Sequence, residues 1–492
     1  MKLKTKNFDW LAGRPVVILT EETAKKLNVH LDERVSISFE GKKIFAVVDL
    51  FQKIVKEGEV GLSNEINSYL KIKENSLVEV SSAPLPQSSK IIKKKLYNQI
   101  LSQEEIELLI SDIVNNKLTE AEIAYFIAAE KICGMSMQEI IYLTKAMVDN
   151  GKKLNFENGI IADKHCIGGI AGNRTTPIVV SICAAAGLKM PKTSSRAITS
   201  AAGTADVIET IANVEISSEE IKKIVNKVGA CLAWGGSLGL APSDDKIIQV
   251  ERLLNLDVEP QLLASIMSKK ISVGTTHLLI DIPYGDGAKI KKSEAKKLGK
   301  KFKLIAKNFG INLRVVLTEG EQPIGNGIGP VLEMLDVLSI LKNKEYCPQD
   351  LREKALFLAS EIMDLCGIKD ARGKAEEILL SGMAFQKFKE IIEAQNGKKD
   401  FEARIKNLKP AQFSKNIYAH KSGKIIELKN KKINQLCRIL GTPESQKAGI
   451  YLNKHLGEVK ENEVIFTMYS ESEQKLQEAY NFIKSDNVFK IK

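Results

Sequence analysis

The sequence predicts an α/β protein. Its central part combines a helical domain with an α/β core, and it is flanked by a small β-rich N-terminal domain and a β-rich α+β C-terminal domain. Three observations predict this arrangement. Residues 1–84 alternate apolar and polar residues in short runs, residues 102–139 contain three helix-start signatures, and residues 160–340 alternate short apolar runs with helical stretches. We therefore expect an N-terminal β-rich domain at 1–84, a helical domain at 85–159, an α/β catalytic domain at 160–340, and a helical connection with the C-terminal α+β domain at 341–492.

The N-terminal region has the pattern of short β-strands. The runs "RVSISFE" and "KIFAVVDL" alternate apolar and polar residues, and glycine and acidic residues separate them. The stretch "SSAPLPQSSK" at 81–90 follows, and its serines and prolines are typical of a linker.

Three helices are expected next, because each begins with a capping box, in which a serine or threonine precedes a glutamate by three residues. The first of them also has apolar residues spaced three or four apart from Ile106 to Ile113, which gives it one apolar face. The three capping boxes are Ser102 with Glu105, Thr119 with Glu122, and Ser136 with Glu139.

The α/β core is expected from alternating elements, which indicate a largely parallel sheet. The predicted strands include "HLLIDIP" (277–283) and "LRVVLTEG" (313–320). Helical stretches are expected at 218–228, 257–272, 293–309 and 331–392, before a charged linker near 395–412 and a short β-rich tail.

Composition predicts a cytoplasmic protein that does not associate with membranes. Hydrophobic residues make up 44% and charged residues 27% of the 492-residue chain, which is ordinary for a soluble globular protein. None of the seven cysteines forms a CxxC pair, so a reducing compartment is favoured and a zinc site is not expected. The longest small-apolar run, 177–188, is shorter than the ~20 residues that span a membrane.

The net charge of +11 predicts a lysine-rich surface that attracts small anionic substrates. Nucleic-acid binding is not expected, because a binding surface would interleave basic with aromatic residues, and aromatic residues make up only 6% of the chain.

The stretch "DKHCIGG" at 163–169 predicts an anion-binding loop, because it precedes a helix expected at 174–187. Ligands of open α/β sheets bind where strands end and helices begin. The paired glycines allow backbone N–H groups to approach an anion, and Lys164 adds a positive charge. The alternative is a tight turn that carries a surface lysine.

The stretch "KTSSRAITSAAGTAD" at 192–206 predicts a second such loop. It combines several hydroxyl side chains with one arginine, and Thr204 lies near the start of a new helix, where an anion can bind. Alternatively, Thr204 caps its own helix. Two loops of this kind predict two phosphate sites, whereas phosphoryl transfer from a nucleoside triphosphate is not expected, because no GxxxxGK[ST] loop occurs.

Six segments resemble those of one enzyme family in the expected order: "DKHCIGGIAGNRTT", "PKTSSRAITSAAGTADVIE", "GACLAWGG", "ASIMSKK", "DIPYGDGAK" and "QPIGNGIGP". Residues 87–492 resemble the thymidine/pyrimidine nucleoside phosphorylases, and the whole chain is similar to the AMP phosphorylases of archaeal type. The resemblance implies phosphorolysis in nucleotide salvage, in which AMP and phosphate give adenine and ribose 1,5-bisphosphate, with CMP and UMP as further substrates. It implies no cofactor and no metal, and a homodimer or larger homo-oligomer.

The resemblance also implies roles for individual residues. Inorganic phosphate would be held by Lys164, Ser194 and Thr204. The nucleotide would be bound by Gly169, Ser195, Arg196, Ala197, Ile198, Thr199, Ser200, Thr204, Ser265 and Lys289. His165, Ser265 and Lys269 would lie near the base, and Asp257 would be the catalytic proton donor.

The chemistry of phosphorolysis agrees with an acid at Asp257. Phosphate attacks C1′ as the N-glycosidic bond breaks, and the base is a poor leaving group until it is protonated, so a carboxylic acid beside it is useful. The alternative interpretation of Asp257 is the N-cap of the helix that contains "VEPQLLASI".

Two positions depart from the family pattern. Glu251, with Arg252 beside it, aligns with the arginine that reads the base in pyrimidine nucleoside phosphorylases, which argues against a dedicated thymidine or uridine enzyme. Cys166 replaces the usual serine, and a thiol is the weaker hydrogen-bond donor. A catalytic thiol is not expected, because phosphate already supplies the nucleophile.

Three alternatives remain at this point. The first is a thymidine/pyrimidine nucleoside phosphorylase. The second is an enzyme like anthranilate phosphoribosyltransferase, which has similar loops but uses pyrophosphate chemistry with magnesium. The third is a nucleotide-binding protein that has lost catalytic activity because Cys166 replaces the serine.

Overall fold

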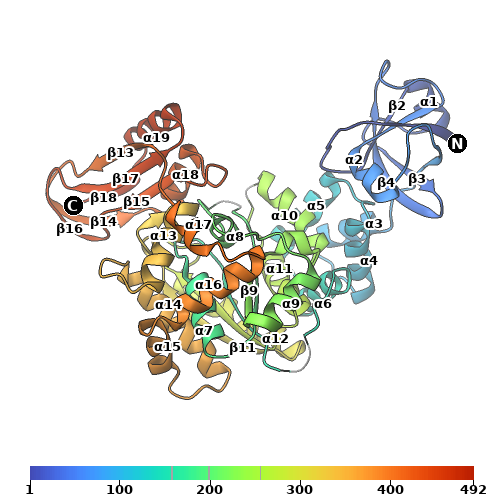
Figure 1. Ribbon diagram of the computed structural model, residues 1–492. Coiled ribbons are helices and arrows are strands. Elements are labelled where there is room, and N and C mark those ends of the chain that lie inside the picture. Colours follow the sequence, from blue (N-terminus) through green and yellow to red (C-terminus); the bar gives the residue numbers. More distant parts are fainter. Residues whose placement is uncertain (157–158, 198–199, 255) are drawn as a thin grey trace. The chain divides into compact units, whose positions relative to one another are not determined.

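The computed structural model describes residues 1–156, 159–197, 200–254 and 256–492. The chain forms two compact units, each built from two segments, and Figure 1 labels their helices and strands. Unit 1 consists of Met1–Gly151 and Ala241–Ser268, and unit 2 consists of Lys152–Leu240 and Lys269–Lys492.

The first part of unit 1 is a closed six-stranded β-barrel with the strand order β1-β5-β2-β4-β3-β6. Its interior is filled by apolar side chains that recur at every second residue, such as Val35 and Ile37 on β3, which are fully buried. Two short helices accompany the strands. The elements are β1 Lys2–Asn7, β2 Val16–Leu19, α1 Glu21–Leu27, β3 Arg34–Phe39, β4 Lys42–Leu50, β5 Glu59–Leu62, α2 Asn64–Leu70 and β6 Leu77–Ser82.

The second part of unit 1 is helical. All three predicted capping boxes are present, at the starts of α4, α5 and α6. The predicted linker at 81–90 is wrong in extent, since β6 ends at Ser82 and a further helix, α3, already begins at Ser88. Ser88 Oγ donates to Asp112 at 2.8 Å, a tertiary contact that the composition of the segment does not indicate. The helices are α3 Ser88–Leu96, α4 Gln103–Val114, α5 Glu120–Cys133, α6 Met137–Asp149, α10 Pro242–Leu254 and the first part of α11 Glu259–Ser272.

Unit 2 contains the predicted α/β core, and the fold class is confirmed. Strands β7 (Ala162–Cys166), β10 (His277–Tyr284) and β11 (Asn312–Glu319) form a parallel sheet in the order β11-β10-β7. Strands β8 (Met190–Ser194) and β9 (Ala230–Trp234) form a parallel pair, and a parallel bridge between Ile161 and Lys189 joins the two groups. The carboxyl ends of β7 and β8 therefore lie at the same edge.

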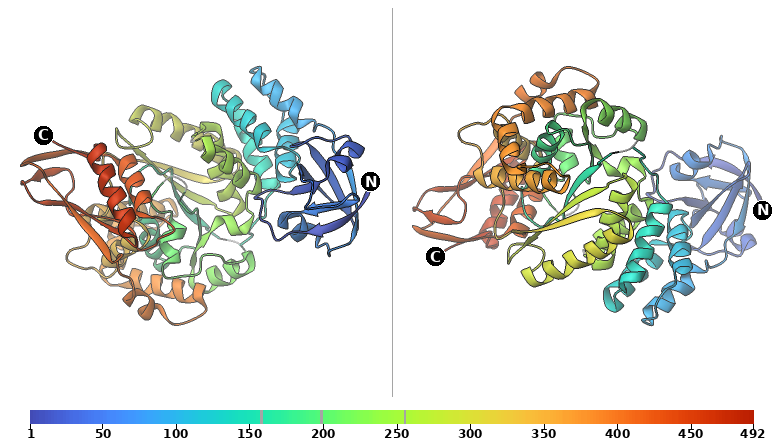
Figure 2. Two further views of the ribbon diagram at one scale, coloured as in Figure 1. Left: turned by 90° about the horizontal axis from the view of Figure 1, so that it is seen from above. Right: turned by 90° about the horizontal axis from the view of Figure 1, so that it is seen from below.

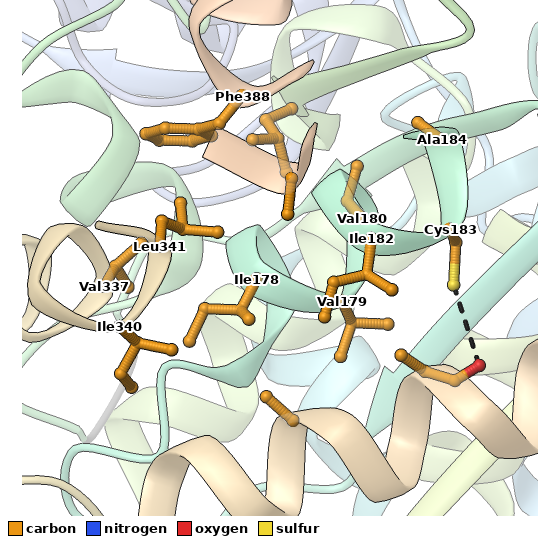
Figure 3. Packing of buried hydrophobic residues seen from close by; sticks show 14 of the residues in the cluster. Ile178, Val179, Val180, Ile182, Cys183, Ala184, Val337, Ile340, Leu341 and Phe388 are labelled. Atoms are coloured by element: carbon orange, nitrogen blue, oxygen red, sulfur yellow. Dashed lines mark hydrogen bonds between the residues drawn. The ribbon is translucent and has the colours of Figure 1, made fainter. Parts of the chain in front are cut away.

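The core of unit 2 surrounds α7 (Thr175–Ala185), in which every residue from Thr175 to Ala184 is buried. Figure 3 shows its apolar side chains together with residues of α13 (Pro330–Leu341) and with Phe388 of α16. The thiol of Cys183 donates to the carbonyl of Ala359 at 3.8 Å. The remaining elements of the core are α8 Thr204–Glu209, α9 Ser218–Val228, the 3₁₀ turn Gly235–Leu238, α12 Lys292–Asn308, α14 Gln349–Leu365, α15 Ala371–Leu380, α16 Met383–Asn396 and α17 Phe401–Lys406.

The C-terminal part of unit 2 is an α+β arrangement of two small sheets with helices α18 and α19 packed together beside them (Figure 2). The short strand β12 (Gly327–Ile328) follows the α/β core but pairs with β15, which connects this part to the core. The elements are β13 Phe413–Tyr418, β14 Gly423–Leu428, α18 Asn430–Leu440, β15 Gly449–Leu452, β16 Gly457–Val459, β17 Val464–Ser470, α19 Glu473–Ser485 and β18 Phe489–Ile491.

Within the described residues, none of the helices combines the length and the apolar character that crossing a membrane requires.

Candidate active site

The first predicted loop, 163–169, is wrong in extent, because residues 163–166 belong to strand β7 and the loop itself begins at Ile167. Its two glycines, Gly168 and Gly169, have φ of +83° and +96°, a conformation that other residues rarely adopt. A Cβ atom on Gly169 would lie 2.6 Å from Cγ of Lys289. The structure thus brings together two residues that the sequence assigned to one nucleotide site from distant positions in the chain.

Lys164 is buried, with 1% of its surface exposed, so the alternative of a tight turn with a surface lysine is wrong. Its Nζ donates to Thr175 Oγ1 at 2.5 Å and to Thr176 Oγ1 at 3.2 Å, both in the first turn of α7. Loss of hydration lowers the pKa of Lys164 to about 8. The lysine therefore supplies a positive charge at neutral pH whose described hydrogen-bond partners are neutral hydroxyls.

Asp163, the residue before Lys164 on β7, belongs to a buried charge cluster. Asp163 lies 2.7 Å from Lys270 Nζ and 3.4 Å from Lys192 Nζ. Burial alone would raise the pKa of Asp163, but the two ammonium groups outweigh burial and hold that pKa below its ordinary value. Burial also lowers the pKa of Lys192, to about 7. The cluster therefore ties the first half of β7 to Lys192 of β8 and Lys270 of α11.

His165 is neutral at physiological pH. Loss of hydration lowers its pKa well below the ordinary value, and the positive charges of neighbouring lysines, with Lys270 the strongest, act in the same direction. A neutral imidazole can donate or accept one hydrogen bond without adding charge.

Cys166 carries a protonated thiol. Burial raises its pKa to about 11, and the Asp281 carboxylate contributes in the same direction. Nδ2 of Asn173 lies 3.7 Å from Cys166 Sγ. Because the thiolate is the reactive form of cysteine, this environment favours an inert thiol.

The second predicted loop, 192–206, is also wrong in extent, because residues 192–194 belong to β8 and α8 already begins at Thr204. The loop between them packs against α8. Asp206, in the first turn of α8, accepts hydrogen bonds from the N–H groups of Ala197 at 2.7 Å and Gly203 at 2.6 Å. A Cβ atom on Gly203 would lie 2.4 Å from the carbonyl oxygen of Ser195, so only glycine permits this packing. Ser194 Oγ is buried and has no hydrogen-bond partner among the described residues.

Thr204 is the first residue of α8, and Gly203 occupies the N-cap position, so the alternative that Thr204 caps its own helix is wrong. Instead, Thr204 Oγ1 accepts a hydrogen bond from Arg174 at 2.6 Å. Sequence reasoning missed Arg174, which also donates to the carbonyl of Ala202 at 2.9 Å and pairs with the buried Glu333 at 2.7 Å. Arg174 lies in "GNRTT", which is part of one of the segments that resemble the family, and this position could have indicated that it belongs to the site.

Arg196 is paired with protein acids. Its guanidinium lies 2.7 Å from Glu209 and 2.8 Å from Glu215, and it stacks over the ring of Trp234 at 4.5 Å from the centroid. Burial raises the pKa of Glu209, and Arg196 partly offsets this. The predicted contact of Arg196 with a 5′-phosphate stays a prediction.

In unit 1, Ser265 Oγ donates to the buried Asp244 at 2.9 Å, and Gln261 donates to the same carboxylate at 3.3 Å. Asp257 lies one residue before Val258, whose carbonyl accepts from the N–H of Leu262 at 2.9 Å. Val258 is therefore the N-cap residue of α11, not Asp257. The carbonyl oxygen of Asp257 accepts a hydrogen bond from Lys131 at 3.2 Å.

The predicted site residues are divided between the units. Asp257 and Ser265 belong to unit 1, and the other described site residues belong to unit 2, including Lys269 on α11 and Ser200, whose Oγ donates to the carbonyl of Ala202 at 3.1 Å. Ile198 and Thr199 lie outside the described residues.

Comparison with known proteins agrees with this architecture. The chain matches the glycosyl transferase family, with its helical bundle domain at residues 89–151 and its a/b domain at residues 158–385. Among solved structures, anthranilate phosphoribosyltransferase from Thermus thermophilus superposes with a TM-score of 0.52 at 17% identity, over 62% of this chain and 98% of that one. At that identity, the likeness concerns the fold alone.

Curated relatives define the family more narrowly. AMP phosphorylase 1 of Archaeoglobus fulgidus is 40% identical over 97% of this chain and 95% of its own length. AMP phosphorylase of Thermococcus kodakarensis is 43% identical over the same shares. A protein of Legionella pneumophila, named only provisionally as a thymidine phosphorylase, is 40% identical over 92% of this chain and 87% of its own. The chain belongs to the AMP phosphorylase family of pentosyltransferases.

Proposed function

We propose that this protein catalyses the phosphorolysis of nucleoside 5′-monophosphates: AMP and phosphate give adenine and ribose 1,5-bisphosphate, and CMP and UMP react similarly. The bond between C1′ and the base nitrogen breaks, a bond between C1′ and a phosphate oxygen forms, and the base leaves with a proton. One observation supports this proposal above the others. From the middle of β7, Lys164 extends its buried ammonium to the first turn of α7, and the unpartnered Ser194 hydroxyl lies at the end of the neighbouring parallel strand β8; α/β enzymes bind ligands where strands end and helices begin.

Inorganic phosphate would bind to Lys164, Ser194 and Thr204. Lys164 provides the charge, and the two hydroxyls provide hydrogen bonds that fix the attacking oxygen. Because the ammonium is buried, its attraction to the phosphate is screened less than it would be in water. Arg174 holds Thr204 in place from the side of α7.

The nucleotide would bind along the second loop, with Gly169 and Lys289 completing its site. Arg196 would bind the 5′-phosphate through two parallel hydrogen bonds. To do so, its guanidinium would have to break its ion pairs with Glu209 and Glu215. The base would lie near His165, Ser265 and Lys269. A neutral His165 suits a position beside an uncharged base.

Asp257 would donate the proton to the departing base. The transition state has oxocarbenium character, so the base nitrogen gains negative charge as the bond lengthens, and a positioned acid lowers the barrier by neutralising that charge. Phosphate then captures C1′.

We propose the following further features, which the resemblance to the family supports. Phosphate is a co-substrate, and no cofactor or metal takes part. The protein works as a homodimer or larger homo-oligomer in the cytoplasm, with AMP and phosphate as its small-molecule partners.

A second candidate function is thymidine phosphorolysis, which the provisional name of the Legionella pneumophila relative favours. Glu251 at the position of the family's base-reading arginine argues against it. A reaction like that of anthranilate phosphoribosyltransferase would depend on magnesium, so a chelator would abolish it and leave phosphorolysis unchanged.

The test is a screen of nucleosides and 5′-monophosphates with and without phosphate, with products identified by chromatography. We expect free adenine and ribose 1,5-bisphosphate from AMP only when phosphate is present. If no base is released from any 5′-monophosphate in the presence of phosphate, the proposed function is wrong, and a nucleotide-binding protein without catalysis becomes the better description.

A further inference from the structure

Both candidate ligand loops are hydrogen-bonded to one helix of the C-terminal part, α18. The first loop, 167–174, follows β7, and the second loop, described at residues 195–197 and 200–203, follows β8. At Ala171 in the first, the backbone N–H donates to Asn430 Oδ1 at 2.9 Å. At Ala201 in the second, the backbone N–H donates to Asn434 Oδ1 at 3.0 Å.

The two attachments are built alike. Ala171 and Ala201 are each 1% exposed and belong to the apolar cluster of the C-terminal part, together with α18 residues such as Ile433 and Cys437. In each loop, one alanine places its side chain in that cluster, and its backbone N–H donates a hydrogen bond to an asparagine of α18. A single helix holds both loops by the same kind of contact.

Asn430 and Asn434 are four residues apart, so they lie on one face of α18, separated by about one helical turn. Both are buried, with 1% and 9% of their surfaces exposed. A buried amide side chain keeps a fixed orientation when its partners are backbone groups. The spacing between the two loops is therefore set by one rigid helical turn.

Asn430 reaches a third segment of the candidate site. Its Nδ2 donates to the carbonyls of Gly287 at 2.9 Å and Gly320 at 3.3 Å. Gly287 lies just before Lys289, whose side chain packs against Gly169. One side chain therefore connects the loop that carries Gly169 with the segment that carries Lys289.

We infer that Asn430 and Asn434 are positioning residues that hold the two ligand loops of the site at a fixed separation, without contacting substrate themselves. The kinetic part of this inference rests on the proposed phosphorolysis, and the structural part does not. Since Asn434 holds the second loop, its removal should affect use of the nucleotide more than use of phosphate.

The test compares Asn434→Leu, which removes the accepting oxygen, with Asn434→Asp, which keeps one. Losing one hydrogen bond to a buried N–H should lower kcat/KM for AMP by about tenfold in Asn434→Leu, with a smaller change for phosphate. Asn434→Asp should recover most of that loss. Should Asn434→Leu not fold, Asn434→Ala removes the same oxygen without added bulk and takes its place.

Ile465→Ala is the matched control, because Ile465 is a fully buried residue of the same apolar cluster on β17. It should lower the Tm while leaving kcat/KM for AMP at the wild-type value. Equal loss of kcat/KM in Ile465→Ala, or failure of Asn434→Asp to recover activity, would assign the effect to general destabilisation and overturn the inference.

Hydrogen exchange gives a readout that does not depend on activity. In Asn434→Leu, the amide of Ala201 should exchange faster than in the wild type, and that of Ala171 should change less. Unchanged exchange at Ala201 would contradict the positioning role. If the wild type exchanges as expected but releases no base from AMP, the proposed function fails while the attachment of the loops stands.

Discussion

At the scale of single residues, the ionisation of Lys164 links structure to pH. The pKa of this buried lysine is lowered to about 8, against an ordinary value of about 10.4. Between these values the unfolded chain still binds the proton that the folded chain has released, so the contribution of Lys164 to folding stability rises with pH. Phosphate binding has the opposite dependence, because it requires the ammonium form.

We therefore predict that kcat/KM for phosphate falls as pH rises above about 8, approaching a tenfold loss per pH unit. Over the same window, the Tm of the wild type should rise relative to that of Lys164→Met. Both are measured from about pH 7 to about pH 11, a window that spans the folded and unfolded pKa values, by initial rates and thermal melts. A kcat/KM for phosphate that stays constant across that window would contradict the assignment of Lys164.

The proposed acid leads to a second prediction. Asp257→Asn should lower kcat on AMP by roughly 10²–10⁴-fold, the usual range for loss of a general acid, since the base would leave unprotonated. AMP binding, measured by calorimetry, should change little. Near-normal turnover by a folded Asp257→Asn enzyme would reject the assignment.

The third prediction concerns the cysteine. With its pKa raised to about 11, the Cys166 thiol is protonated at pH 7. Cys166→Ser replaces the thiol with a stronger hydrogen-bond donor, so kcat/KM for phosphate should equal or exceed that of the wild type. An inactive Cys166→Ser enzyme would instead indicate thiol chemistry.

At the scale of elements, Arg174 connects α7 with α8 and with α13, through Thr204, Ala202 and Glu333. Burial raises the pKa of Glu333, and Arg174 partly offsets that shift. Removing the arginine leaves the glutamate buried without its ion-pair partner, which typically destabilises a protein by about 3–5 kcal/mol.

We predict a loss of that size for Arg174→Leu in denaturant unfolding, and partial recovery of stability in the double variant Arg174→Leu with Glu333→Leu, because no unpaired charge remains. Activity should not recover in the double variant, since Thr204 and Ala202 have still lost their donor. Joint recovery of stability and kcat/KM would show that Arg174 acts only through folding.

Local signals predicted the elements well. The helices that begin at Gln103, Glu120 and Met137 were predicted because a capping box is complete within four residues. The start of α3 was missed, because its contact with Asp112 lies 24 residues away and leaves no local pattern.

The site could be predicted only in part, because contacts between residues far apart in the chain leave no local sequence pattern. Loop sequences pointed to Lys164, Gly169 and Thr204, but not to the residues that hold them. Asn430 and Asn434 act across 259 and 233 residues, and neither belongs to a recognisable motif. Burial of Lys164 also depended on how α7 packs, which the sequence around Lys164 does not specify.

At the scale of the whole molecule, Asp257 and Ser265 belong to unit 1, and Lys164, Ser194 and Thr204 belong to unit 2. The chain's net charge of +11 favours the approach of anionic substrates, and AMP carries a phosphate that adenosine lacks. Discrimination between these two compounds therefore tests whether a second anion site exists.

The most direct measurement is the ratio of kcat/KM for AMP to that for adenosine, with thymidine as a third substrate, at saturating phosphate. A hydrogen bond to a charged group contributes about 1.5–3 kcal/mol, so two or three contacts to the 5′-phosphate should favour AMP by at least about 10²-fold. We predict a ratio of that size or larger. Cleavage of adenosine or thymidine as efficient as that of AMP would contradict the account and identify a nucleoside phosphorylase.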